Sequence, residues 1–131
     1  MIKAEIENFT EKELACRCCG KLTIHNEALI SLQAFRYYLN RKYRKNIRIT
    51  VSCGTRCPKH NKEVGGVANS QHLLGMAFDI ISSDLDFEIL YPEAVACRLF
   101  STIIRYDNSR FVHVDTRERP NYGVQCWNWD K

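Results

Sequence analysis

The sequence lacks any long apolar run. No window approaches the roughly 18 consecutive apolar residues of a membrane-spanning helix, and the opening MIKAEIENFTEKEL has no apolar segment of the kind that directs secretion. We therefore expect a protein made in the cytoplasm without a signal peptide and without a membrane span. Internal repeats and low-complexity linkers are also missing, so we expect residues 1–131 to form a single domain and the protein to be a monomer.

A strong excess of charge of either sign is missing as well. The formal net charge is +4, and much of the positive charge lies in RKYRKNIR, residues 41–48. This run is typical of a solvated helix end, and contact with an anionic polymer, cell wall or nucleic acid, is the alternative. Because Tyr43 is the only aromatic side chain within the run, base stacking has little support, and we expect no nucleic-acid partner.

Cysteine, in contrast, is abundant, with 7 residues. In a chain with no apparent secretion signal, we expect reduced thiols or metal ligands rather than a disulfide framework. Cys16, Cys18 and Cys19 form a run that is more tightly spaced than the ligands of a conventional zinc finger. Together with Cys57 or Cys126 they could hold a second, structural metal; buried reduced thiols or a disulfide are the alternatives.

Apolar periodicity predicts two helices and a long loop. Residues 26–43 repeat apolar side chains on one helical face, with Asn26 expected to cap the start. A second helix is expected over residues 91–104, with Pro92 in its first turn. Residues 54–71 are rich in glycine and asparagine and are expected to form the longest loop, a place where function is common.

Three short apolar or alternating segments predict strands, at residues 47–53, 76–81 and 110–117. In the first, alternation places Cys53 on the same face as Val51. The order of helices and strands predicts an α+β domain, in which helices pack on a small, mostly antiparallel sheet.

Polar side chains interrupt two of these strands. Asp79 lies in the second, and His113 and Asp115 lie in the third. Burying a carboxylate costs several kcal/mol unless a cation or hydrogen bonds compensate it. Zinc accepts imidazole and carboxylate ligands, and its catalytic sites use three protein ligands and a water. With His72, seven positions before Asp79, the pattern therefore predicts a zinc site formed by His72, Asp79 and His113.

At this point the residues resemble a known family. SQHLLGMAFD, residues 70–79, is similar to the SxHxxGxAxD motif of the zinc D-alanyl-D-alanine carboxypeptidases. FVHVDTR, residues 111–117, resembles the strand that supplies the third ligand in that family, and CGTRCPKHN resembles its arginine-bearing segment, with Arg56 as the arginine. The resemblance covers residues 8–117 and implies the fold shared by hedgehog domains and D-Ala-D-Ala peptidases.

The resemblance also implies a function. Zn²⁺ bound by His72, Asp79 and His113 would activate a water and polarise the scissile carbonyl. Arg56 would hold a substrate carboxylate or the developing oxyanion, and Ser70 would hydrogen-bond the substrate. The expected substrate is a peptidoglycan stem peptide, cut next to a D-amino acid by a carboxypeptidase or endopeptidase. We expect a phage-type lysis enzyme that acts on the cell wall after release.

The general base is left open. Many members carry Glu or Asp three residues before the last histidine, where this chain has Arg110. Asp115 is the preferred candidate because alternation places it on the face of His113, although a structural salt bridge is an equally good interpretation, and Asp107 is the alternative base. Arg110 also favours an alternative function, a non-catalytic zinc-binding module in cell-wall or phage-tail attachment.

Overall fold

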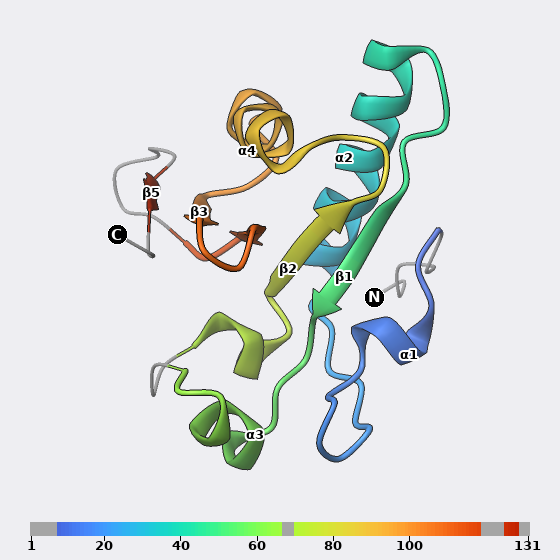
Figure 1. The fold of residues 1–131 in the computed structure, drawn as a ribbon. Coiled ribbons are helices and arrows are strands. Elements are labelled where there is room, and N and C mark those ends of the chain that lie inside the picture. The colour runs from blue at the N-terminus through green and yellow to red at the C-terminus, as the bar shows by residue number, and fades with distance from the viewer. Residues whose placement is uncertain (1–7, 67–69, 119–124, 129–131) are drawn as a thin grey trace.

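The computed structural model describes residues 8–66, 70–118 and 125–128, and Figure 1 shows their arrangement. The helices and strands of this part of the chain are, in order, α1 (Glu11–Leu14), α2 (Asn26–Tyr43), β1 (Ile49–Cys53), α3 (Pro58–Glu63), the 3-10 helix η1 (Gln71–Leu74), β2 (Ala77–Ser82), α4 (Phe87–Ala96), β3 (Thr102–Tyr106), β4 (Phe111–Asp115) and β5 (Gln125–Asn128).

One sheet organises these elements. Its strand order is β1-β2-β4-β3-β5. The first four strands in this order pair antiparallel, and β5 joins the edge parallel to β3. The predicted α+β class, with a small and mostly antiparallel sheet, is therefore confirmed. No helix of the described residues is long and apolar enough to cross a membrane.

The two long helices, α2 and α4, bury one face of the sheet (Figure 1). Alternation along β2 and β4 turns every second side chain toward these helices, so Phe78, Ile80, Val112 and Val114 enter the core. From α2, Leu32 and its apolar neighbours at helical spacing meet them. The intervening residues of β2 and β4, among them Asp79 and His113, therefore lie on the opposite face.

The predicted helix over residues 91–104 is wrong at both ends. Helix α4 begins earlier, after Asp86, whose side chain accepts a hydrogen bond from the Glu88 N–H. It ends at Ala96 with Pro92 inside it, and residues 102–106 form β3. Pairing with β4 decides the conformation here, because the β-branched residues of this apolar segment fit a buried strand as well as a helix.

Two smaller expectations also fail. The long loop predicted over residues 54–71 is interrupted by the helix α3, and η1 begins at its last residue, Gln71. Helix α2 has the predicted bounds, but its N-cap is His25 rather than Asn26, without a side-chain cap hydrogen bond. Local pattern therefore identified the long helix and missed the short ones, which cap and packing interactions fix.

A bulge in β1 changes the direction of Cys53. The register of β1 against β2 shifts between Val51 and Cys53, so that Val51 pairs with Ile80 and Cys53 with Asp79. The extra residue moves Cys53 off the core face on which alternation had placed it. Cys53 consequently lies beside Asp79, on the face opposite α2 and α4.

A buried carboxylate ties α4 to α2. Glu93 is 5% exposed and accepts hydrogen bonds from Tyr38, Lys42 and Tyr43 of α2. Burial opposes its ionisation, but the hydrogen bonds from Lys42 and the two tyrosines hold the pKa of Glu93 below its ordinary value. The ionised carboxylate is thus the form that stabilises the packing of the two helices.

Replacing Glu93 with glutamine should lower the free energy of unfolding by about 1–3 kcal/mol, because charged, buried hydrogen bonds are weakened. The stabilisation by Glu93 should be complete above its unfolded pKa of 4.5 and disappear as the pH falls through the lowered folded pKa. Urea denaturation over a pH series measures both effects. Glu88→Gln, at an exposed site on α4, is the matched control and should change stability by less than about 1 kcal/mol.

Candidate metal centre

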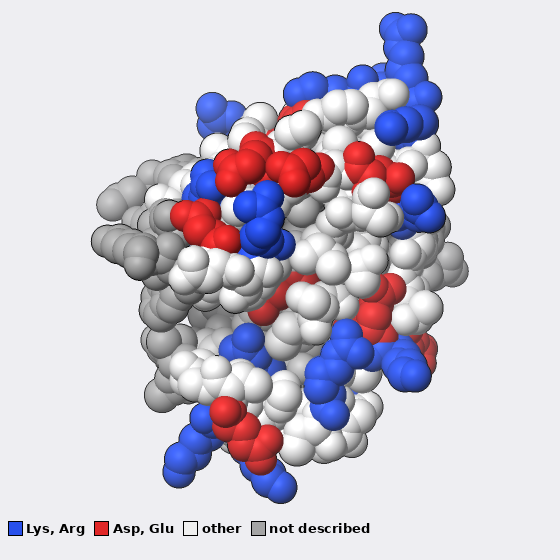
Figure 2. All heavy atoms as spheres, viewed as in Figure 1, with Lys and Arg blue, Asp and Glu red and all other residues white. Residues whose placement is uncertain are grey.

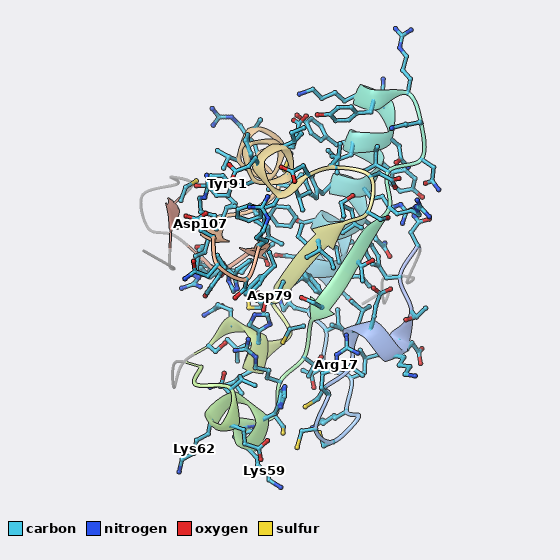
Figure 3. The ribbon with its side chains drawn as sticks, in the orientation of Figure 1. Arg17, Lys59, Lys62, Asp79, Tyr91 and Asp107 are labelled. Atoms are coloured by element: carbon cyan, nitrogen blue, oxygen red, sulfur yellow. The ribbon has the colours of Figure 1, made fainter. Side chains whose placement is uncertain are left out.

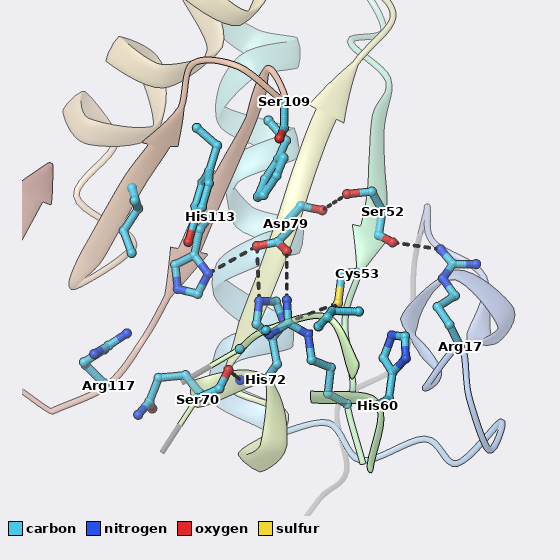
Figure 4. Close-up of a pocket in the computed structure, with 18 residues that line it drawn as sticks. Arg17, Ser52, Cys53, His60, Ser70, His72, Asp79, Ser109, His113 and Arg117 are labelled. Carbon is cyan, nitrogen blue, oxygen red and sulfur yellow. Dashed lines mark hydrogen bonds and ion pairs between the residues drawn. The ribbon is translucent and has the colours of Figure 1, made fainter. Parts of the chain in front are cut away.

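Sheet register brings the two strand-borne candidates together. In the antiparallel ladder between β2 and β4, Asp79 is directly opposite His113, and on the other side of β2 Asp79 pairs with Cys53. Directly opposite residues of an antiparallel pair project to the same face with their Cβ atoms about 5 Å apart. The three side chains therefore form a row across the open face of the sheet (Figure 4).

His72 reaches this row from η1. Ser70 caps that short helix, because its hydroxyl accepts a hydrogen bond from the His72 N–H at 3.2 Å. Gly75 ends the helix with φ of +70°, and a Cβ there would lie 2.1 Å from the Thr23 carbonyl oxygen. Only glycine fits this left-handed, crowded position, so Gly75 lets the chain turn from His72 into β2.

Two imidazoles converge on one carboxylate oxygen. His72 Nε2 lies 3.1 Å from Asp79 Oδ1, and His113 Nδ1 lies 3.2 Å from the same oxygen. All three side chains are buried, with residue exposures of 2% for His72, 4% for Asp79 and 6% for His113. The structure therefore brings together the three residues that the sequence analysis selected as metal ligands (Figure 4).

In each ring, the nitrogen that points away from Asp79, called here the outer nitrogen, faces a hydrogen-bond acceptor. His72 Nδ1 lies 2.8 Å from the carbonyl oxygen of Gly54, and His113 Nε2 lies 2.7 Å from Oδ2 of Asp115. A carbonyl or an ionised carboxylate can only accept, so the outer nitrogens donate. In the neutral imidazoles the inner nitrogens then carry lone pairs directed at the Asp79 carboxylate.

The electrostatics of the cluster show how it is balanced without a metal. Burial opposes a charged imidazolium, but the adjacent Asp79 carboxylate raises the pKa of His72 to about 10. Burial likewise opposes ionisation of Asp79, yet His72 and His113 hold the pKa of that carboxyl well below its usual range. The ionised Asp79 carboxylate thus has the His72 ring and the Arg56 guanidinium beside it, and a bound metal ion would take the place of the proton on His72.

Two of the three ligand spacings suit a zinc ion. Ligand atoms about 2.0–2.1 Å from a tetrahedral zinc ion lie roughly 3.3 Å from one another, close to the spacings seen here between Asp79 and the two imidazoles. An outer ring nitrogen that donates to a carbonyl or carboxylate is also the usual support of a zinc-bound histidine. His72, Asp79 and His113 would hold the ion, with Gly54 and Asp115 as their supports.

Cys53 offers a second ligand set. Cys53, His72 and Asp79 can each place one ligand atom within 4.8 Å of the others. The Cys53 sulfur, however, lies 3.9 Å from the outer nitrogen of His72 and accepts a hydrogen bond from Arg56 Nε at 3.3 Å. His72 Nδ1 is also bonded to the Gly54 carbonyl, which leaves Nε2 as the His72 nitrogen that faces Asp79.

Arg56 enters the cluster from the loop after β1. Its guanidinium lies 3.5 Å from Asp79 Oδ2 and donates to Asn61 Oδ1 at 3.1 Å. Gly66 is packed against this arrangement, since a Cβ there would lie 2.9 Å from Arg56 Nη1. A fixed, always charged planar donor thus stands beside the candidate ligands, where a substrate carboxylate or oxyanion could meet it.

Asp115 and Asp107, the two candidates for the general base, are both engaged in ion pairs. Asp115 is fully buried between His113 and Arg117, and although burial opposes its ionisation, these two partners lower the pKa of Asp115 to about 2. It meets the outer nitrogen of His113, away from Asp79. Asp107 pairs with Arg105 at 2.7 Å, and Arg110 pairs with Asp86 at 3.3 Å.

A pocket of about 680 Å³ opens over the cluster. Figure 2 shows this face hollowed, with acidic atoms visible in the hollow and Lys and Arg side chains beside it. Among the described residues that line the pocket, Asp79 is the only carboxylate. The basic side chains of the lining are Arg17, Arg56, Arg117 and His60, beside His72 and His113.

Comparison with protein families assigns the chain. A model of the family described as peptidase M15, the zinc D-Ala-D-Ala carboxypeptidase-like peptidases, matches residues 7–115, which is most of the sequence. The chain belongs to the peptidase M15 family. The matched range contains Cys53, His72, Asp79, His113 and Arg56 of this M15 peptidase. No curated protein matched the chain.

Sequence reasoning missed three residues of this M15 site. Arg117 follows Asp115 at a spacing of two, so continued alternation was an available signal. Cys53 was predicted on the core face, because alternation along the strand does not reveal the bulge in β1. Arg17 reaches the pocket from the loop after α1, where its guanidinium donates to the carbonyls of Val51 and Ser52, and no local signal in the sequence indicates that contact.

Zinc content discriminates between the two ligand sets. The Cys53→Ser protein should keep the wild-type zinc content of the site, whereas His113→Ala should lose about one zinc ion per chain, because a catalytic site needs three protein ligands. Metal analysis after gel filtration measures this. If Cys53→Ser lost the ion and His113→Ala kept it, the set with Cys53 would be the correct one.

Proposed function

We propose that this M15 peptidase is a zinc metallopeptidase that hydrolyses peptidoglycan stem peptides next to a D-amino acid. The observation that carries the proposal is the convergence of His72 Nε2 and His113 Nδ1 on Asp79 Oδ1, with an arginine beside it. Bound there, zinc would lower the pKa of a bound water toward neutrality and polarise the scissile carbonyl. The site of action would be the cell wall.

The pocket supports a substrate that ends in a carboxylate. Arg56 is anchored to Asn61 and Cys53, so its guanidinium is held in place before a substrate arrives. With Arg17 and Arg117 also in the lining, positive charge dominates the described walls around Asp79. A peptide ending in D-Ala-D-Ala offers a carboxylate one residue from the scissile bond, which favours the carboxypeptidase form over the endopeptidase form.

For Asp115 we propose a positioning role in place of the general base. Its contact with His113 Nε2 fixes the ring so that Nδ1 faces Asp79. The Ser70 hydroxyl is engaged with the His72 N–H, so Ser70 supports the ligand loop, and as a lining residue it can also contact substrate. Proton transfer would then fall to another group of the pocket. We propose His60, the imidazole of the lining that is not a candidate metal ligand, for this role.

A second function is favoured by one observation. The described lining of the pocket contains no carboxylate apart from Asp79, and Arg110 stands where many members carry the acidic base. A zinc-binding module of the same fold without hydrolytic activity, used in cell-wall or phage-tail attachment, would have this composition.

Hydrolysis assays separate the two functions. The zinc-loaded protein should release D-alanine from a D-Ala-D-Ala-terminated peptide or cleave purified cell wall, and His72→Ala should abolish both activities. Arg56→Lys should lower kcat/KM by about 10²-fold or more with zinc content unchanged, because a bidentate donor is lost. Retained zinc with no cleavage of either substrate would instead support the attachment module.

Asp115→Asn tests the positioning role. Loss of the support for His113 should weaken zinc affinity by about 10–100-fold, measured by competition with a chelator. A general base would behave differently, with activity falling by about 10²–10⁴-fold at full zinc occupancy and unchanged affinity. Asp107→Asn is the matched control, and both its zinc affinity and its activity should equal those of the wild type.

A further inference from the structure

A second cluster of potential ligands lies apart from the peptidase site. The thiol sulfurs of Cys16, Cys19 and Cys57 all lie within 4.8 Å of one another. In Figure 3 sulfur atoms gather between the loop after α1 and helix α3, near the end of the molecule from which Lys59 and Lys62 extend. All cysteines of the cluster are free thiols in the structure.

Cys16 and Cys19 lie in a segment whose spacing and backbone turn are typical of a metal-binding site. Cys16 and Cys19 are separated by two residues, the spacing of a zinc-binding CxxC pair, although the whole run, with Cys18 between them, is more tightly spaced. The backbone closes on itself here, because the Cys16 N–H donates to the Lys21 carbonyl at 2.8 Å and the Gly20 N–H donates to the Cys16 carbonyl at 2.9 Å. Gly20 has φ of +75°, which suits glycine in such a tight turn.

The surroundings of the sulfurs suit thiolates. The Cys16 sulfur is buried and accepts a hydrogen bond from the Cys57 N–H at 3.3 Å, and the backbone N–H groups of Cys18 and Cys19 also face it. The Cys57 sulfur accepts from the His60 N–H at 3.4 Å. Backbone donors aimed at sulfur stabilise negative charge there, as the supporting hydrogen bonds of metal-bound thiolates do.

We propose that Cys16, Cys19 and Cys57 bind a structural zinc ion, with Cys18 as the fourth ligand. The Cys18 thiol lies near that of Cys57 but outside the group of three close sulfurs, so it would have to move toward them to bind the ion. Sulfurs bound to one zinc ion at about 2.3 Å lie roughly 3.8 Å apart, within the spread of this cluster. Cys126, the alternative partner, instead lies beside Tyr91.

The ion would join two segments that are distant in the sequence. Residues 15–25 form neither helix nor strand, and Cys57 immediately follows Arg56. A zinc ion shared by Cys16, Cys19 and Cys57 would therefore hold the N-terminal segment to the loop that presents Arg56 to the pocket. A closed site with four thiolates leaves no open position, so its role is structural rather than catalytic. This inference is independent of the proposed peptidase activity.

Zinc counting on the full chain, purified under reducing conditions, tests the proposal. In the His72→Ala background, which removes the proposed catalytic site, about one zinc ion per chain should remain. Adding Cys19→Ser or Cys57→Ser should remove it, and adding Cys97→Ser, a cysteine at the end of α4, should not. Equal zinc in the Cys19, Cys57 and Cys97 variants, or none in the His72→Ala protein, would overturn the proposal.

Cobalt substitution covers the case in which a serine variant fails to fold. The Cys53→Ser, His72→Ala protein keeps the whole cysteine cluster, and its Co²⁺ form should show the intense near-ultraviolet absorption of thiolate-to-cobalt charge transfer. Absence of that absorption, with folding verified by circular dichroism, would contradict the site. So would a thiol titration of the denatured, metal-free protein that finds two cluster cysteines oxidised to a disulfide.

Discussion

The charge of Asp79 is the constraint on which the site depends. A carboxylate that is 4% exposed on the open face of a sheet must be balanced, because an uncompensated buried charge costs several kcal/mol. Three separate segments supply the balance: η1 brings His72, β4 brings His113, and the loop after β1 brings Arg56. The fold therefore gathers two imidazoles and a guanidinium around the carboxylate at the point where the three segments meet.

Each of the two imidazoles is fixed by a hydrogen bond at one ring nitrogen, and this decides which nitrogen faces Asp79. Gly54 and Asp115 occupy the outer nitrogens, so each ring turns one defined nitrogen toward Asp79. Alternation along β4 correctly placed Asp115 on the face of His113, but residues two apart on a strand are neighbours along that face. The sequence could not reveal which ring nitrogen Asp115 would meet, and the positioning role proposed for Asp115 depends on that detail.

The sequence predicted the parts of the fold that local pattern controls. Helix α2 and the strand positions of Asp79 and His113 follow from periodicity. The apolar segment up to residue 104 fits a strand as well as a helix, and only its pairing with β4 settles the choice. The bulge that turns Cys53 toward Asp79 is equally non-local, because it exists only in the register of β1 against β2. The site needed both kinds of information.

The short loop after β1 links the candidate metal centre around Asp79 to the cysteine cluster, because each of its four residues contacts one of the two clusters or the segment between α1 and α2. Gly54 accepts from His72, Thr55 exchanges hydrogen bonds with Thr23, and Arg56 faces Asp79. Cys57, the next residue, contacts Cys16. One side of the loop is thus fixed to the ligands of the peptidase site and the other to the segment between α1 and α2. The anchoring of that segment and the placement of Arg56 are therefore joined by a continuous series of hydrogen bonds through four consecutive residues.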